Sequence, residues 1–299
     1  MVVLPAHLVA TPVLERLAGG RSGVVLGAGA TACWVDLDGF VVAVTTREVP
    51  LLPNAVALAA GSGSLRRAGL AAGTVARSAP GRIDLGTLRV TWDPTAPPAW
   101  DPTVPEAAQA APEALAGRAA AILGIRRREV GDPDALVREL AATGLPTAAD
   151  PGGAAGLARL LHAVRDRDPG AAAGAARELL GRGPGLTPEG DDLLAAVAGS
   201  LAVLGPAAGW DRPVLTGFLA ALVAAAPERT TALSATLLEL AARGMLAEPA
   251  GRLLDLGPGA EAAWPAALAR LERLGHGSGR AYATGIAATF NLMAAGPVG

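Results

Sequence analysis

The segment that divides this sequence reads DPTAPPAWDPTVPEAAQAAP and runs from Asp93 to Pro112. Six of its twenty residues are proline. Because proline fixes φ and lacks a backbone N–H, no continuous helix or strand can run through such a segment. The pattern therefore predicts a connector or wrapping arm between two regions that are built differently.

The residues before this connector read as short β-strands. They form runs of β-branched and aromatic residues that are interrupted by glycine and aspartate. The run Asp36-Leu37-Asp38-Gly39 is typical of a tight hairpin turn. The predicted strands are Val24–Leu26, Cys33–Leu37, Phe40–Thr45 and Leu88–Trp92.

A glycine pattern near the start of the chain has the outline of a dinucleotide-binding fingerprint. Residues 27–32 read GAGATA after a predicted strand, and Glu48 follows about twenty residues later. The space before the next strand is too short for a crossover helix, however. The pattern is therefore interpreted as a turn between two strands, and a dinucleotide site is rejected.

The residues after the connector show a helical pattern. One helix is expected to begin at Asp132-Pro133 and to end at Gly144, because proline suits a first helical turn and glycine a helix end. The sequence thus predicts an α+β protein, with a β-rich N-terminal region (1–100) followed by a larger, mostly α-helical region (101–299). Further helices are expected at 153–167, 170–181, 187–204, 212–226, 228–243, 260–274 and 280–294.

Composition and charge exclude several classes of function. The formal net charge is −2, which gives no electrostatic reason to bind nucleic acid. The single Cys33 rules out a disulfide within the chain and a cysteine-based zinc site, and the three histidines lack metal-ligand spacing. The sequence contains no lysine, so a phosphate-loop lysine and a Schiff base are excluded.

The location expected from the sequence is the cytoplasm. The first residues lack the basic and apolar pattern of a signal peptide. The uncharged run from Leu193 to Trp210 contains Gly199, Gly205 and Pro206 and is rich in alanine. It is interpreted as a buried core helix and not as a membrane span, which needs about 20 strongly apolar residues.

The most specific motif is the turn Gly181–Asp192, which reads GRGPGLTPEGDD and leads into a predicted helix. Thr187 is expected to cap that helix, with Pro188 in its first turn. The glycines, among them Gly183, Gly185 and Gly190, allow a ligand to approach the backbone closely. Because N–H groups at a helix start attract anions, this turn predicts a site for an anionic ligand.

The paired carboxylates of Asp191 and Asp192 follow this turn directly. Asp191 shares a helical face with Leu194, Ala195 and Ala198, so an inward carboxylate needs a partner, a metal ion or a proton. The carboxylates could merely complement the helix dipole, but that role requires neither the glycines nor two adjacent acids. A catalytic or metal-binding role is therefore favoured, with Mg²⁺ as the candidate ion.

Two further clusters are candidates for the same site. Thr230, Thr231 and Ser234 lie at a predicted helix start, where a cap with a back-bonded serine and a binding role are equally compatible with the pattern. Residues 275–280 read GHGSGR and open onto another helix. Their register does not match a nucleophile elbow, so an anion-binding turn with Arg280 and His276 is preferred to a Ser278 nucleophile.

These motifs together resemble the AllH-type family, named for a subunit of the oxamate carbamoyltransferase of anaerobic allantoin breakdown. The family's Gly-Leu-Thr-Pro-Ser-Gly-Asp-Asp signature is matched by GLTPEGDD at residues 185–192. Thr230–Ser234 and Gly277–Gly279 also fit. Glu189 departs from the signature, because it places a third carboxylate where the family has serine. The resemblance implies a multi-subunit enzyme that interconverts oxamate plus carbamoyl phosphate with oxalurate plus phosphate.

The predicted function is therefore a carbamoyltransferase subunit acting on a small ureido or amide acid. Its expected partners are a small anionic metabolite and other transferase subunits, without nucleic acid or membrane; no organic cofactor is implied. A stand-alone metal-dependent hydrolase or lyase and a non-catalytic metabolite-binding scaffold are the alternatives. The candidate catalytic residues are Asp191, Asp192 and His276, with Asp191 and Asp192 as the metal ligands if a metal is bound. The candidate binding residues are Gly183, Gly185, Thr187, Gly190, Thr230, Ser234, Gly277, Ser278, Gly279 and Arg280.

Overall fold

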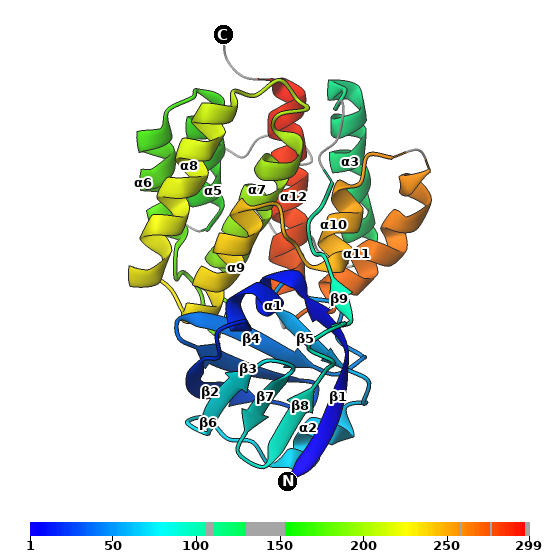
Figure 1. The fold of residues 1–299 in the computed structure, drawn as a ribbon. Helices are drawn as coiled ribbons and strands as arrows, with labels where there is room; N and C mark the ends of the chain where they lie inside the picture. The colour runs from blue at the N-terminus through cyan, green and yellow to red at the C-terminus, as the bar shows by residue number, and fades with distance from the viewer. Residues whose placement is uncertain (106–109, 130–152, 258, 276, 297–299) are drawn as a thin grey trace. The chain divides into compact units, whose positions relative to one another are not determined.

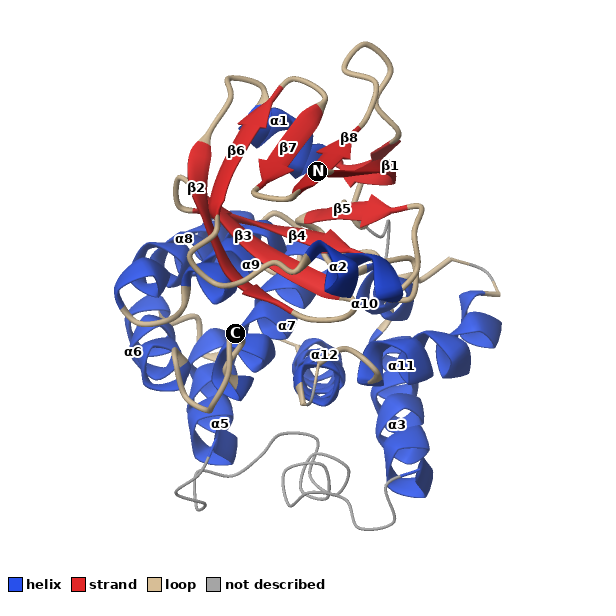
Figure 2. Ribbon diagram, turned by 90° about the horizontal axis from the view of Figure 1, so that it is seen from below, coloured by secondary structure: helices blue, strands red, loops and turns tan. Residues whose placement is uncertain are grey.

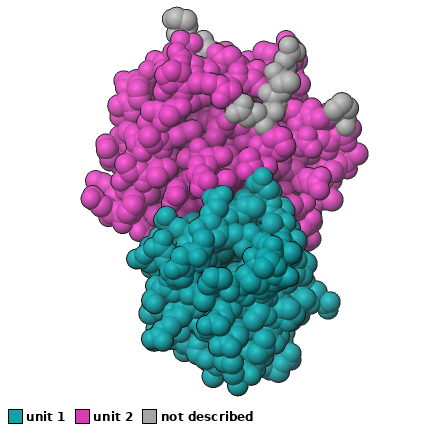
Figure 3. Space-filling view, viewed as in Figure 1, with its two compact units in different colours: residues 1–102 teal, residues 103–299 magenta. Residues whose placement is uncertain are grey.

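The computed structural model of the protein describes residues 1–105, 110–129, 153–257, 259–275 and 277–296. The chain divides into two compact units, Met1–Pro102 and Thr103–Gly299, which Figure 3 shows in different colours. The helix predicted at 132–144 and the candidate residue His276 lie outside the described residues. The α+β architecture, with a β-rich region first and a mostly helical region after it, is confirmed.

The first unit is built on one sheet that closes on itself. Its strand order is β5-β4-β3-β2-β6-β7-β8-β1-β9, and β1 also pairs with β5, so the first eight strands of this order form a barrel (Figure 2). Most neighbours are antiparallel, but β1 is parallel to β8 and to β9, and β4 is parallel to β5. The strands are β1 (Val2–Ala10), β2 (Ser22–Ala28), β3 (Ala32–Leu37), β4 (Phe40–Thr45), β5 (Ala55–Leu58), β6 (Val75–Ala79), β7 (Arg82–Leu85), β8 (Leu88–Thr91) and β9 (Ala99–Trp100).

Two short helices and several unpredicted strands complete this unit. The helices are α1 (Thr11–Leu17) and α2 (Gly63–Ala68). Strands β1, β5, β6 and β7 were not predicted, because each is short or carries proline, arginine or serine that masks the alternation of apolar residues. Strand β9 lies inside the proline-rich segment, where Ala99 and Trp100 pair with β1. The segment is therefore not a simple connector throughout.

Buried residues alternate with more exposed ones in several strands of the barrel, whereas β4 and β5 are buried along their whole length. Along β3, Cys33, Val35 and Leu37 are buried and alternate with partly exposed residues. In β7 and β8 the buried side chains are Ile83, Leu85, Leu88 and Val90. Burying such a side chain contributes roughly 1.5–3 kcal/mol, so the alternation fixes which face of these three strands points inward.

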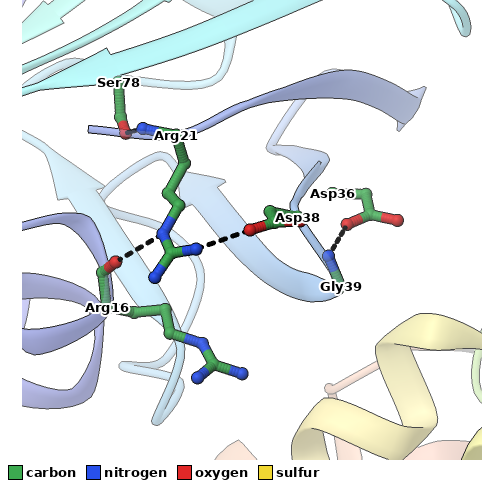
Figure 4. Close-up of polar contacts among 6 residues, drawn as sticks. All are labelled: Arg16, Arg21, Asp36, Asp38, Gly39 and Ser78. Carbon is green, nitrogen blue, oxygen red and sulfur yellow. Dashed lines mark hydrogen bonds and ion pairs between the residues drawn. The ribbon is translucent and has the colours of Figure 1, made fainter. Parts of the chain in front are cut away.

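The predicted hairpin turn is confirmed between β3 and β4. Asp38 and Gly39 both adopt positive φ, at 58° and 80°, which is the backbone of a two-residue type I′ turn. The Gly39 N–H donates to Asp36 Oδ1 at 2.8 Å, and the Arg21 guanidinium contacts Asp38 Oδ2 at 2.5 Å (Figure 4). The glycine pattern at 27–32 is also confirmed as a turn, because it joins the antiparallel strands β2 and β3.

The second unit is a bundle of helices (Figure 1). The predicted helices from residue 153 onward are present, with shifted ends, and α10 was not predicted because it is only two turns long. Within the described residues the α-helices are α3 (Pro112–Glu129), α5 (Gly153–Arg165), α6 (Pro169–Leu179), α7 (Glu189–Leu204), α8 (Arg212–Ala225), α9 (Ala232–Ala242), α10 (Glu248–Leu254), α11 (Trp264–Glu272) and α12 (Ser278–Ala295). Two 3₁₀ turns, η1 (Ala226–Glu228) and η2 (Ala260–Ala263), precede α9 and α11.

Helix α7 forms the centre of this bundle and is buried along almost its whole length. It lies side by side with α12 (Figure 1), and it also packs against α9. Glycine permits the α7–α12 contact, since a Cβ atom at Gly285 would lie 2.7 Å from the Cβ of Ala196. The apolar run that begins at Leu193 is thus a buried core helix, as predicted. None of the described helices has the length and apolar character that crossing a membrane requires.

A buried arginine joins α3 to the segment that leads into α11. The guanidinium of Arg118 donates to the Asp255 carbonyl at 2.5 Å and to Glu261 Oε1 at 3.0 Å. It also lies 4.3 Å from the ring centroid of Trp264, which is a cation–π contact. Burial lowers the pKa of Arg118, and the neighbouring carboxylates partly offset this effect. The contacts of Arg118 therefore compensate for the burial of its charge.

Candidate functional site

Three helix starts from distant parts of the sequence meet in the second unit. The side chains that join them are Thr187 before α7, Asp191 and Asp192 in the first turn of α7, Thr230 before α9, and Ser278 at the start of α12. We call these five residues the aspartate site. The predicted convergence of the Gly181–Asp192, Thr230–Ser234 and Gly275–Arg280 segments is therefore present.

Close backbone packing and positive φ values explain why the turn before α7 is rich in glycine. Gly181, Gly183 and Gly185 have φ values of 71°, 118° and 99°, a region that side chains disfavour. A Cβ atom at Gly181 would lie 2.4 Å from the Arg229 carbonyl oxygen, and one at Gly190 would lie 2.1 Å from the Leu179 carbonyl oxygen. The glycines thus let this turn lie directly against α6 and against the segment that enters α9.

Asp191 ties two of these segments together. Its Oδ1 accepts a hydrogen bond from the Gly181 N–H at 2.8 Å, and its Oδ2 accepts one from the Thr230 hydroxyl. The side chain is 2% exposed. The partner that an inward-facing carboxylate at this position requires is therefore provided by the protein itself.

Thr187 has a different role from the predicted one. The residue at the cap position of α7 is Pro188, whose carbonyl accepts the first helical hydrogen bonds from Asp191 and Asp192. The expected Thr187 cap is therefore wrong by one residue. Its hydroxyl instead lies 2.9 Å from the Ser278 hydroxyl on α12. This contact joins the starts of α7 and α12.

Among the described carboxyl groups, Asp192 is the one whose pKa is raised far above its ordinary value. Its side chain is 3% exposed, and this burial raises the pKa from 3.8 to about 7. A hydrogen bond from Ser278 lowers the pKa, the negative charges of Asp191 and Glu189 raise it, and a hydrogen bond from Thr187 lowers it. A carboxyl group that titrates near neutrality can exchange a proton with a ligand at physiological pH.

The residues of the Thr230–Ser234 cluster have different roles, because Thr231 caps α9 whereas Thr230 belongs to the aspartate site. Thr231 is the residue that caps α9, because its Oγ1 accepts from the Ser234 N–H at 3.1 Å. Thr231 also donates to the Leu186 carbonyl at 2.6 Å, which anchors the glycine-rich turn. Ser234 is buried, and its hydroxyl has no partner among the described residues. The Ser234 hydroxyl therefore does not bond back to the backbone of its own helix, which was one of the two interpretations of this sequence pattern.

The remaining candidate residues lie on the same segments as the residues of the aspartate site. Gly183 and Gly185 are exposed in the turn before α7, and Gly277 precedes Ser278 at the start of α12. Gly279 serves packing, because a Cβ atom there would lie 1.8 Å from the Leu271 carbonyl oxygen. Arg280 is exposed in the first turn of α12.

Metal binding at the aspartate pair stays a prediction. Within the part of the chain that the structure describes, no group of three or more histidine, cysteine, aspartate or glutamate side chains could hold a metal ion. Both oxygens of Asp191 already accept hydrogen bonds.

Three residues near the aspartate site were not predicted from the sequence. Tyr282, the single tyrosine of the chain, lies one turn after Ser278 on α12 and is buried. Burial raises its pKa, and the charge of Asp192 raises it further, so the two groups lie close together. Arg182 and Arg229 are exposed on adjoining segments, since the Arg229 backbone packs against Gly181. The i+4 spacing from Ser278 is the signal that could have identified Tyr282.

The fold and the site define an α+β protein whose helical unit holds a buried acid at the junction of three helix starts. The sequence model of the AllH family, described as oxamate carbamoyltransferase subunit AllH, matches residues 179–290. This match spans the glycine-rich turn, the aspartate site and most of α12, and it confirms the predicted resemblance over this segment. No curated protein and no solved structure gives a significant match to the chain.

Proposed function

We propose that this protein is a subunit of a carbamoyltransferase and that its aspartate site handles a small amide acid such as oxamate. The observation that carries the proposal is the buried carboxyl of Asp192, whose burial raises its pKa to about 7 and which lies within the segment matched by the AllH family. The family description names oxamate and a subunit role, and both are extended here to this chain.

The chemistry of carbamoyl transfer requires a proton acceptor. The amide nitrogen of the acceptor forms a bond to the carbamoyl carbon, the bond from that carbon to the phosphate oxygen breaks, and the nitrogen loses a proton. Asp192 is the group that takes this proton, because a general base is most effective when its pKa lies near the working pH. Ser278 and Thr187, whose hydroxyls already bond to Asp192, orient the amide.

Positive groups around the site hold the anionic ends of the ligands. The starts of α7 and α12 carry partial positive charge, which favours carboxylate and phosphoryl oxygens. Arg182, Arg229 and Arg280 are exposed on the three converging segments and add full positive charges. Guanidinium groups suit carboxylates and phosphates because they donate two parallel hydrogen bonds.

The test is transfer by a reconstituted complex. The chain would be combined with its candidate partner subunits, and phosphate-dependent cleavage of oxalurate to carbamoyl phosphate would be measured. We expect turnover that the isolated chain lacks, and we expect Asp192→Asn to reduce kcat by at least about 100-fold, the scale of general-base catalysis. Asp166→Asn, at an exposed aspartate of the same unit, serves as the matched control. A complete complex that shows no transfer, or that turns over normally with Asp192→Asn, would overturn the proposal.

A further inference from the structure

The two adjacent aspartates differ in their partners, because Asp191 is held by a backbone N–H as well as a hydroxyl, whereas Asp192 is bonded by hydroxyls. Asp191 is held by a backbone N–H of Gly181 and by the hydroxyl of Thr230, both of which belong to segments that flank α7. Asp192 is bonded by the hydroxyls of Ser278 and Thr187, which also contact each other. A hydroxyl rotates freely and can turn from the protein to a ligand, whereas a backbone N–H cannot.

The contacts of Asp191 are built into the packing of the turn. Gly181 adopts a φ of 71° and lies so close to Arg229 that a side chain would collide with its carbonyl oxygen. Thr230 follows Arg229 directly, so its hydroxyl and the Gly181 N–H reach the same carboxylate from adjoining backbone segments. This arrangement fixes the first turn of α7 from the α9 side, and Asp192 is the next residue on that turn.

We propose that Asp191 is a positioning residue which, held by Gly181 and Thr230, fixes the orientation of Asp192 and does not itself contact the reacting atoms. This inference rests on the proposed function for its kinetic consequences and deepens that proposal by separating the roles of the two aspartates. From the sequence, a catalytic or metal-binding role is favoured for both aspartates, and only the need of an inward Asp191 for a partner distinguishes them.

The effect of the negative charge of Asp191 can be separated experimentally from the effect of its hydrogen bonds to Gly181 and Thr230. Asn at position 191 still offers an oxygen to the Gly181 N–H, and its amide can donate to the Thr230 hydroxyl. Asp191→Asn therefore retains the positions of the groups but removes a negative charge beside Asp192. The charged and titratable groups that act on Asp192 are Asp191 and Glu189 on α7, with Tyr282 close by on α12. Removing one of these charges should lower the pKa of Asp192.

Thr230→Val removes the geometric tie, since valine has the shape of threonine without its hydroxyl. The start of α7 then loses one of its two anchors, and Asp192 gains solvent, which also lowers its pKa. Thr230→Ser keeps the hydroxyl and should restore the wild-type behaviour. The control is Thr289→Val on α12, because the Thr289 hydroxyl also donates a hydrogen bond, but within its own helix, to the Gly285 carbonyl, and it is fully buried whereas Thr230 is partly exposed.

The first measurement is the titration of Asp192 in the full chain, monitored by NMR of its carboxyl carbon. The Asp192→Asn variant, which lacks this signal, identifies it. We expect a lower pKa in Asp191→Asn and Thr230→Val, and a wild-type pKa in Thr230→Ser and Thr289→Val. An unchanged pKa in both Asp191→Asn and Thr230→Val would overturn the inference. This readout needs no turnover, so it stands even if the complex proves to catalyse another reaction.

The second measurement is the kinetics of the reconstituted complex. A misplaced base costs up to about 100-fold in rate, so Thr230→Val should reduce kcat at least about 10-fold with KM changed less than about 3-fold. Asp191→Asn should keep kcat at high pH within about 5-fold of wild type and move the acid limb of its pH profile to lower pH. If Asp191→Asn instead abolished turnover as Asp192→Asn does, Asp191 would be a catalytic group and the division of roles would be refuted.

Discussion

Replacing Asp192 by asparagine is expected to change the pH dependence of stability in a defined direction. The folded state raises the pKa of this carboxyl from 3.8 to about 7, chiefly through burial. Between these two values the unfolded chain has released the proton while the folded chain still holds it. The free energy of unfolding contributed by this group is therefore highest below about pH 4 and falls as the pH rises to about 7.

The magnitude follows from the same two values. At about 1.4 kcal/mol for each pH unit, the gap between 3.8 and about 7 corresponds to about 4 kcal/mol. Asparagine has nearly the same shape and keeps an oxygen to accept the Ser278 and Thr187 hydroxyls, but it does not ionise. The stability of Asp192→Asn relative to wild type should therefore increase by about 4 kcal/mol between about pH 4 and about pH 8.

The assay is denaturant unfolding at a series of pH values, followed by far-ultraviolet circular dichroism, which mainly reports the helices of the second unit. The quantity of interest is the difference between variant and wild type, since a constant offset from the amide does not affect its slope. Asp166→Asn, at an exposed site, should give a difference that changes by less than about 0.5 kcal/mol over the same range. A flat difference for Asp192→Asn, or one that decreases with pH, would refute the idea that this carboxyl is buried and holds its proton to neutrality.

Three further predictions concern packing and surface contacts elsewhere in the chain. Gly190→Ala should lower the free energy of unfolding by at least about 2 kcal/mol, because its Cβ would lie 2.1 Å from the Leu179 carbonyl oxygen. Gly174→Ala is the control in α6, because a Cβ atom there would meet nothing within 4 Å. It should raise the free energy of unfolding by about 0.5–1 kcal/mol in the same denaturation assay. Arg118→Lys should lower the melting temperature clearly, since an ammonium group cannot reproduce the planar contacts with Trp264, Glu261 and the Asp255 carbonyl; an unchanged thermal melt would show that only charge matters there. Arg21→Ala should cost less than about 1 kcal/mol at low salt and less still at high salt, because its ion pair with Asp38 is largely exposed.

Much of the helical unit could be predicted because its sequence signals are local. Asp168 with Pro169 and Asp211 with Pro213 mark helix starts, and the apolar face of each helix recurs within a few residues. The hairpin at Asp38-Gly39 is equally local, since only residues that tolerate positive φ fit its turn.

The closure of the β-sheet could not be predicted for the opposite reason. It depends on β1 meeting β5 and β8, which lie roughly fifty and eighty residues further on, and no short window of sequence encodes such a pairing. Strand β1 carries Pro5 and exposed Val2 and Val3, so its composition does not reveal a strand with neighbours on both sides. The register of pairing becomes visible only in three dimensions.

The aspartate site was predicted in part. The residue types of the three helix starts were sufficient to expect their convergence, because buried acids and hydroxyls need partners. The different environments of Asp191 and Asp192 were not predictable, since they depend on which hydroxyl from α9 or α12 reaches which carboxylate. Tyr282 was overlooked because an aromatic residue on an apolar helix face is usually part of the core.

The triple pairing of β1 also has a consequence for how the chain acquires its structure. This strand is made before its partners β5, β8 and β9, which end at Leu58, Thr91 and Trp100, so a ribosome must pass residue 100 and release it before all three ladders can form. Until then β1 can pair with β5 but lacks its ladders with β8 and β9, and pairing over such sequence separations is slow. Substitutions that weaken the pairing of β1 should therefore affect folding yield more strongly than equivalent changes at the hairpin between β7 and β8.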